Sequence, residues 1–171
     1  VSVVMRRYRL GGLGLWESAL ARGNDEGAGL RELLAGPMQL RTPDGHALRG
    51  EGAFTEVAPH RVVYEGRADH AGVSVTTRTE TEYDGCTRVE LTLAPDAEGA
   101  ELPGLWLDIP IRDEMAPLWH MVKTGIRRNP AGFAPRGEGQ VWDSSRAPDY
   151  SRWPGGFKPL TFVPYIWLGA E

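Results

Sequence analysis

The feature that most constrains the fold is a strict two-residue alternation over residues 73–93. In its first half, valine or threonine fills every second position, and the positions between are polar or charged. A second alternating run starts at Thr87, after the dipeptide Asp84-Gly85, which is a strong signal for a tight hairpin turn. The pattern predicts two long antiparallel strands, each with one buried face and one solvated, charged face.

Shorter strand signals occur on both sides of this hairpin. One is a second turn signal, Pro43-Asp44-Gly45, with short apolar segments before and after it. Pro110 cannot donate to a β-ladder, so the last strand should end there or lie at a sheet edge. The predicted strands are Val3–Leu10, Met38–Arg41, Ala47–Arg49, Arg61–Glu65 and Leu105–Ile111.

Helix signals are few. Residues 25–34 could form a short helix, with Asn24 as its cap and Gly36 as its stop, and residues 113–121 could form one or two turns. The segment from Gly125 to Pro159 has no period, and a run of that kind usually serves a function or contacts another domain. The 22 glycines and 13 prolines fit short strands joined by many turns.

These patterns predict a mostly β chain, an antiparallel β-sandwich with one or two short helices. Residues 1–171 are expected to form one domain, and an incomplete β-sandwich that lacks some of its strands is compatible with this pattern.

Composition excludes several classes of function. The net charge of −4 argues against a general nucleic-acid-binding role, which usually requires a basic patch. No apolar run approaches the roughly 20 residues that cross a bilayer, so we expect no membrane partner. No charged start precedes an apolar stretch, so we expect no signal peptide in this chain, and the compartment stays open. The single cysteine, Cys86, excludes an internal disulfide.

No motif predicts a metal, a cofactor or a catalytic centre. The four histidines lack the spacing of metal ligands. The acidic pairs Asp25-Glu26 and Asp113-Glu114 lie at predicted helix starts, where acidic residues favour the helix dipole. Ser144-Ser145 lacks the glycines of a nucleophile elbow. The basic cluster around Arg127-Arg128 is more typical of a solvated face than of a phosphate site.

The candidate contacts for carbohydrate are mainly tryptophans. Trp142 could stack on a sugar ring while Asp143 accepts hydrogen bonds from its hydroxyls. The alternative is that Trp142 packs on a sheet edge and Asp143 caps a turn, and it is the favoured interpretation. The other candidates are Trp106, Trp119, His120 and Trp153.

Two segments in this order resemble the N-terminal domain of glycoside hydrolase family 123 and its uncharacterised relatives. The first is Leu102–Arg112, and the second is Gly139–Ser145, followed by Phe157 and then Val163–Gly169. Leu34–Leu40 and the strand at Arg61–Tyr64 fit the same layout, so the resemblance spans nearly the whole chain.

The resemblance implies a β-sandwich that precedes a (β/α)₈ barrel. Characterised enzymes of the family are similar to β-N-acetylgalactosaminidases, in which an Asp-Glu pair of the barrel orients the substrate acetamide as nucleophile. This sequence contains no such barrel, and neither of its acidic pairs matches the position of the catalytic pair. The chain is therefore expected to be the non-catalytic N-terminal part of a larger glycosidase. We expect that larger enzyme to be secreted or periplasmic. Its expected partner is the barrel, whose substrate cleft it supports or completes.

Two other interpretations are left open. A carbohydrate-binding module would use the tryptophans as a stacking platform and would bind a glycan without the barrel. A stand-alone enzyme ranks last, because no acid, base and nucleophile converge in the sequence.

Overall fold

The computed structural model describes residues 1–23, 29–96, 98–121, 131–135, 137–140 and 166–170. The chain divides into two compact units, Val1–Ile111 and Arg112–Glu171. All described strand pairs are antiparallel, and the mostly β, sandwich-like class expected from the sequence is confirmed. No helix among the described residues is long and apolar enough to cross a bilayer.

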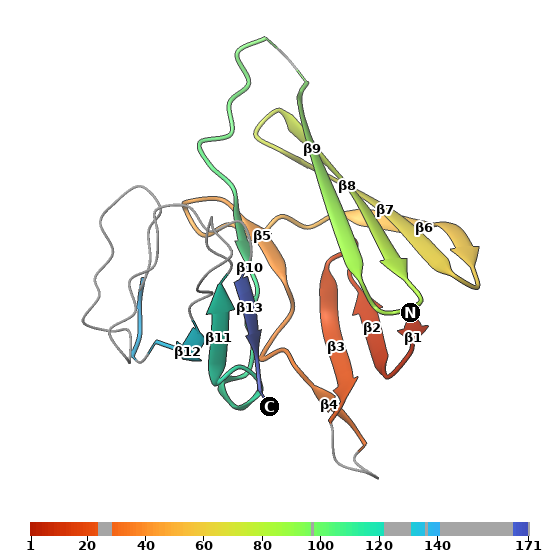
Figure 1. Cartoon of the computed structure of the whole chain (residues 1–171). Helices are drawn as coiled ribbons and strands as arrows, with labels where there is room; N and C mark the ends of the chain where they lie inside the picture. Colours follow the sequence, from red (N-terminus) through yellow and green to blue (C-terminus); the bar gives the residue numbers. More distant parts are fainter. Residues whose placement is uncertain (24–28, 97, 122–130, 136, 141–165, 171) are drawn as a thin grey trace. The chain divides into compact units, whose positions relative to one another are not determined.

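The first sheet of unit 1 has the order β1-β2-β3-β4 (Figure 1). Its strands are β1 (Ser2–Val3), β2 (Arg6–Leu10), β3 (Trp16–Arg22) and β4 (Leu30–Glu32). The prediction of one strand over Val3–Leu10 was wrong in one respect, because the chain turns between β1 and β2. Met5 adopts φ 60° at this turn, a conformation that extended strands exclude.

The predicted helix over residues 25–34 was also wrong. Its described part contains strand β4, which pairs with β3, while residues 24–28 lie outside the described residues. The Glu32 carboxylate accepts hydrogen bonds from the backbone N–H of Ala19, at 2.8 Å, and of Leu34, at 3.1 Å. The helix signal of this segment is weak, because Gly27 and Gly29 lower its helix propensity. Pairing with β3 therefore decides its structure.

A two-stranded ribbon joins β5 (Gln39–Arg41) to β10 (Trp106–Asp108). The predicted turn after β5 is confirmed, since the Gly45 N–H donates to the Thr42 carbonyl and Arg41 bridges Ala47. β10 pairs with β5 alone among the described strands and ends before Pro110, as predicted for an edge strand.

The longest sheet has the order β6-β7-β8-β9 (Figure 1). Its strands are β6 (Glu51–Ala58), β7 (Arg61–His70), β8 (Val73–Glu82) and β9 (Thr87–Pro95). The alternation predicted for β8 is confirmed, with its valines and odd-numbered threonines buried. The buried face predicted for β9 was wrong beyond Val89, because Leu91 is 42% exposed and Leu93 is 49% exposed.

The loop Gly11–Gly14, between β2 and β3, packs directly against the long sheet. The Thr77 hydroxyl of β8 donates to the Leu13 carbonyl at 2.8 Å. A Cβ atom on Gly66 would lie 2.6 Å from the Gly12 carbonyl oxygen, so this approach requires glycine in β7. Around this contact lies the main core cluster, which consists of Leu13, Leu15, Leu40, Leu48, Ala68 and Val75.

The first sheet also holds the turn between β8 and β9. The Arg6 guanidinium donates to the Asp84 carbonyl at 2.8 Å, and the Tyr8 hydroxyl donates to the Gly85 carbonyl at 3.1 Å. Tyr8 is buried and its ring stacks on Trp16, with 4.5 Å between ring centroids. These contacts tie the N-terminal strands to the hairpin that the sequence marks most clearly.

The described part of unit 2 contains a 3₁₀ turn, η1 (Asp113–Met115), and a sheet of order β12-β11-β13. Its strands are β11 (Leu118–Met121), β12 (Ala131–Phe133) and β13 (Ile166–Gly169). One helical turn of the predicted segment 113–121 is confirmed by η1. The rest of that segment forms no second turn, because Leu118–Met121 is strand β11. β12 lies within the predicted irregular segment 125–159, and most of that segment lies outside the described residues.

Candidate functional site

The structure describes three of the six predicted carbohydrate contacts. Trp142, Asp143 and Trp153 lie outside the described residues. Trp119 is 1% exposed on β11, so its ring presents no free face to a ligand, and the prediction of a surface contact there is corrected. His120 is half-buried beside it, and Trp106 is 59% exposed on β10.

Trp106 lies on a polar face of the β5–β10 ribbon. The antiparallel register sets Trp106 opposite Arg41 and Asp108 opposite Gln39. Directly opposed residues share a face of the ribbon, so these four side chains lie on one side. The other side carries Leu40, which is 1% exposed, and Leu107. We refer to Gln39, Arg41, Trp106 and Asp108 as the Trp106 face.

An ion pair fixes the polar part of the Trp106 face. Arg41 Nη1 donates to Asp108 Oδ2 at 3.2 Å, and Arg41 Nε and Nη2 both donate to the Gly45 carbonyl, at 3.3 and 3.0 Å. Among the described residues, no hydrogen bond reaches Asp108 Oδ1. Arg41 is therefore held in place, and one carboxylate oxygen of Asp108 stays open as an acceptor.

This arrangement can bind a neutral ligand that has an apolar side and hydroxyl groups. The exposed indole ring offers a flat apolar surface, and the Asp108 oxygen and the Gln39 amide offer hydrogen bonds. The charges of Arg41 and Asp108 cancel, so the face does not select for an ionic ligand. No proton-transfer or nucleophilic step follows from these groups.

Sequence reasoning found Trp106 but missed its neighbours. Trp106 and Asp108 are two residues apart in a strand, so period two alone could have placed them on one face. Arg41 and Gln39 are about 65 positions away, and only the cross-strand register brings them to the site.

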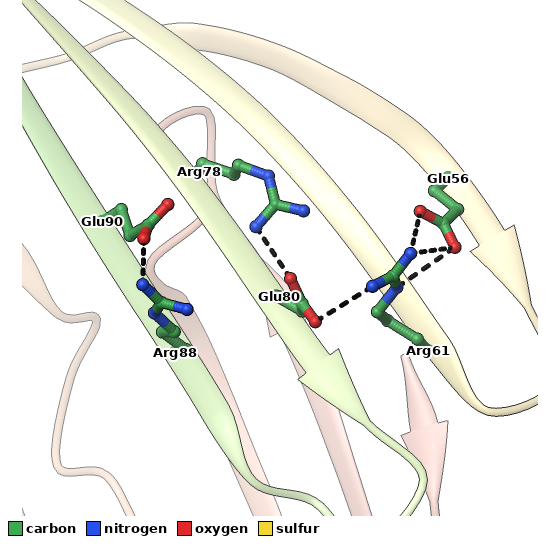
Figure 2. Close-up of polar contacts among 6 residues, drawn as sticks. All are labelled: Glu56, Arg61, Arg78, Glu80, Arg88 and Glu90. Atoms are coloured by element: carbon green, nitrogen blue, oxygen red, sulfur yellow. Dashed lines mark hydrogen bonds and ion pairs between the residues drawn. The ribbon is translucent and has the colours of Figure 1, made fainter.

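A second polar surface covers one face of the long sheet. Figure 2 shows its six central residues, which come from all four strands: Glu56, Arg61, Arg78, Glu80, Arg88 and Glu90. Arg61 Nη2 contacts both carboxylate oxygens of Glu56, at 2.8 and 2.7 Å. Glu80 accepts from Arg78 at 2.7 Å and from Arg61 at 3.4 Å. The three arginines and three glutamates balance, which confirms the charged face predicted for β8.

These pairings shift the pKa values of two of the charged groups. A hydrogen bond from Arg78, with the nearby Arg61 charge, lowers the pKa of Glu80. Hydrogen bonding to Glu56 and its charge raise the pKa of Arg61. A general acid needs a carboxyl group whose pKa is raised toward neutrality, and the shift at Glu80 has the opposite direction. The charged face therefore fits a solvated sheet surface better than a catalytic one.

The two acidic pairs noted in the sequence do not form a catalytic or metal centre among the described residues. Asp113 and Glu114 are exposed at the 3₁₀ turn η1, and Asp25-Glu26 lies outside the described residues. Within the described part of the chain, no three histidine, cysteine, aspartate or glutamate side chains gather as a metal site would require. Cys86 is exposed.

The small sheet of unit 2 exposes large apolar side chains. On the face that carries His120, Phe133 of β12 is 64% exposed and Trp167 of β13 is 39% exposed. On the opposite face, Ile166 and Leu168 are 41% and 46% exposed. Phe133, Ile166, Trp167 and Leu168 form what we call the unit 2 apolar set. The last three of these belong to an apolar run that is visible in the sequence, whereas no sequence pattern marks Phe133.

Comparisons of the chain with protein-family models, with curated proteins and with solved structures return no match.

Proposed function

We propose that this chain is a non-catalytic β-sandwich domain of a glycoside hydrolase, which supports or completes the substrate cleft of a catalytic (β/α)₈ barrel. The observation that carries the proposal is the unit 2 apolar set. A sheet buries its apolar face against another layer, and here both faces of a three-stranded sheet expose apolar side chains. A partner domain would cover them.

The described polar residues are compatible with this role. The glutamates of the charged face are paired with arginines, and no described group combines a nucleophile, an acid and a base. The resemblance to the N-terminal domain of family 123 supplies the identity of the partner, a glycosidase barrel.

The test uses the full 171-residue chain and a separately expressed family 123 barrel that lacks its own N-terminal domain. We expect the two to co-elute and the barrel to gain thermal stability. Phe133→Ser should weaken the association about tenfold or more, which corresponds to about 1.4 kcal/mol. Val57→Ser is the control, since Val57 of β6 is 75% exposed in unit 1 and lies outside the proposed contact.

Catalysis is tested on the chain alone with p-nitrophenyl β-N-acetylgalactosaminide. We expect hydrolysis no faster than in buffer. Turnover by the purified chain would contradict the non-catalytic role. A barrel that neither binds the chain nor changes in stability or activity would contradict the supporting role.

The Trp106 face favours a second candidate function, a carbohydrate-binding module. An exposed ring beside an open carboxylate oxygen is the pattern expected of a neutral pyranoside site, in which the ring's C–H groups lie on the indole. This candidate predicts affinity without any barrel.

A glycan array of the purified chain, with hits measured by calorimetry, tests the second candidate. Trp106→Ala should weaken a genuine hit about tenfold or more, because it removes the apolar ring on which the sugar's C–H groups lie. Phe133→Ala removes an aromatic ring of similar exposure elsewhere and should leave the affinity unchanged. A blank array with folded protein would remove the binding-module candidate and leave the scaffold role.

A further inference from the structure

Strand β9 forms one edge of the long sheet and pairs with β8 alone among the described strands (Figure 1). Its register is continuous over the nine residues Thr87–Pro95. The opposite edge, β6, has a register shift between Phe54 and Glu56. Such irregularities hinder an edge from pairing with another chain. β9 is therefore the edge of this sheet that can accept a further strand.

The exposed side chains of β9 indicate that a neighbour would be accommodated. Leu91 and Leu93 are exposed on the face where β8 buries Val73 and Val75. Protected edges commonly carry charges on the inward face, carry a proline or are very short. Over Thr87–Ala94, β9 has none of these features, and its proline, Pro95, lies at the strand end. A second strand beside β9 would cover the outer flank of Leu91.

The charge pattern of β9 is complementary to a second copy of the same strand. Arg88 and Glu90 lie on the charged face on either side of Val89, with side chains 71% and 43% exposed (Figure 2). If two β9 strands pair antiparallel about a twofold axis at Val89, each Arg88 faces the Glu90 of the other copy. A shift that centres the axis on Glu90 would oppose two glutamates, which is unfavourable.

We propose that this chain forms a symmetric dimer through β9, in antiparallel register centred on Val89, so that two long sheets join into one continuous sheet. The contact is isologous, since the same surface serves both copies. The inference depends neither on a glycosidase barrel nor on the Trp106 face, because it uses the edge and charges of β9 only.

Sedimentation equilibrium of the full chain tests for the dimer. Two short edge strands bury less than the roughly 1,600 Å² of a standard interface, so the dimer should be concentration-dependent. We expect the apparent mass to rise from 18.8 kDa toward twice that value as the concentration rises from about 5 to about 200 µM. A mass that stays at the monomer value over this range would overturn the proposal.

Charge reversal tests the register. Arg88→Glu opposes glutamates at both contacts, and Glu90→Arg opposes arginines, so each variant alone should stay monomeric at the concentrations where the parent chain dimerises. Mixed in equal amounts, the two variants have complementary edges and should recover the dimer. Both sites are exposed, and circular dichroism verifies that each variant is folded.

Arg67→Glu is the matched control. Arg67 pairs with Asp69 at the same two-residue spacing, but on the central strand β7, with side chains 60% and 59% exposed. This variant should dimerise like the parent chain. A dimer that survives Arg88→Glu uses another surface, and single variants that stay monomeric after mixing exclude the Val89 register; either result overturns the proposal.

Discussion

Two buried threonines on the same face of β8 differ in hydrogen bonding. Thr77 is 2% exposed and its hydroxyl donates to the buried Leu13 carbonyl at 2.8 Å. Thr79 is 1% exposed, and its hydroxyl has no hydrogen-bond partner in the described part of the chain. A buried polar group costs free energy when it lacks a partner, so identical substitutions at the two positions should differ in effect.

We predict that Thr77→Val lowers the free energy of unfolding by about 1–2 kcal/mol, because it leaves the Leu13 carbonyl unpaired. Thr79→Val should be neutral or stabilising, since it replaces an unpaired hydroxyl with a methyl group of the same size. Urea unfolding followed by circular dichroism measures both changes. Equal losses at the two positions would show that the Thr77 hydrogen bond contributes nothing specific.

At the scale of elements, the loop Gly11–Gly14 lies so close to β7 that side chains are excluded between them. A Cβ atom on Gly66 would meet the Gly12 carbonyl oxygen at 2.6 Å and the Leu13 Cα atom at 2.8 Å. Both are backbone atoms, which cannot rotate away as the end of a long side chain can. The contact between loop and sheet therefore depends on glycine in the middle of a strand.

We predict that Gly66→Ala lowers the free energy of unfolding by about 1–3 kcal/mol, the usual cost of overpacking. Gly29→Ala is the control, because a Cβ atom there meets nothing within 4 Å and its φ is not positive. The control should be neutral or slightly stabilising, since alanine restricts the unfolded chain. Chemical unfolding of the two variants gives the comparison, and similar midpoints would contradict the close packing of the loop.

The charged face of the long sheet should make stability depend on pH. The pKa of Glu80 is lowered in the folded chain, chiefly by the hydrogen bond from Arg78. A lowered folded pKa stabilises the fold fully above the unfolded pKa, and this contribution is lost as the pH falls through the folded pKa.

We therefore predict that the urea midpoint of Glu80→Gln lies below that of the parent chain at pH 7 and converges with it by about pH 3. Glu82→Gln, at the exposed end of the same strand, should follow the parent chain at both pH values. A difference for Glu80→Gln that does not change with pH would mean that the carboxylate charge is not what stabilises the sheet.

For the whole molecule, the sequence predicted the class of fold and its central hairpin, and it failed where distant segments decide the outcome. Period two and the Asp84-Gly85 turn were sufficient for β8. They were not sufficient for Leu91, because burial depends on what covers a face and not on the alternation of the strand itself. Residues 30–32 became a strand through pairing with β3, which no local propensity encodes.

In the candidate sites, too, local sequence predicted some residues, and contacts between distant segments decided the others. Trp106 was predicted from its residue type, and Asp108 could have been predicted from its spacing. Arg41 could not, because it reaches Trp106 through a register between strands far apart in the chain. The apolar exposure of Phe133 likewise depends on the pairing of β12 with β11.

The hydrogen bonds from Arg6 and Tyr8 to the β8–β9 turn also constrain how the molecule can be made. Each joins residues 77 or 78 positions apart, so the N-terminal strands cannot complete their contacts until the ribosome has released the turn. At synthesis rates of about 5–20 residues per second, this delay is about 4–16 seconds. Throughout that interval Tyr8 lacks its acceptor, and the nascent chain is exposed to chaperones and proteases before its first sheet has made its contacts with the turn.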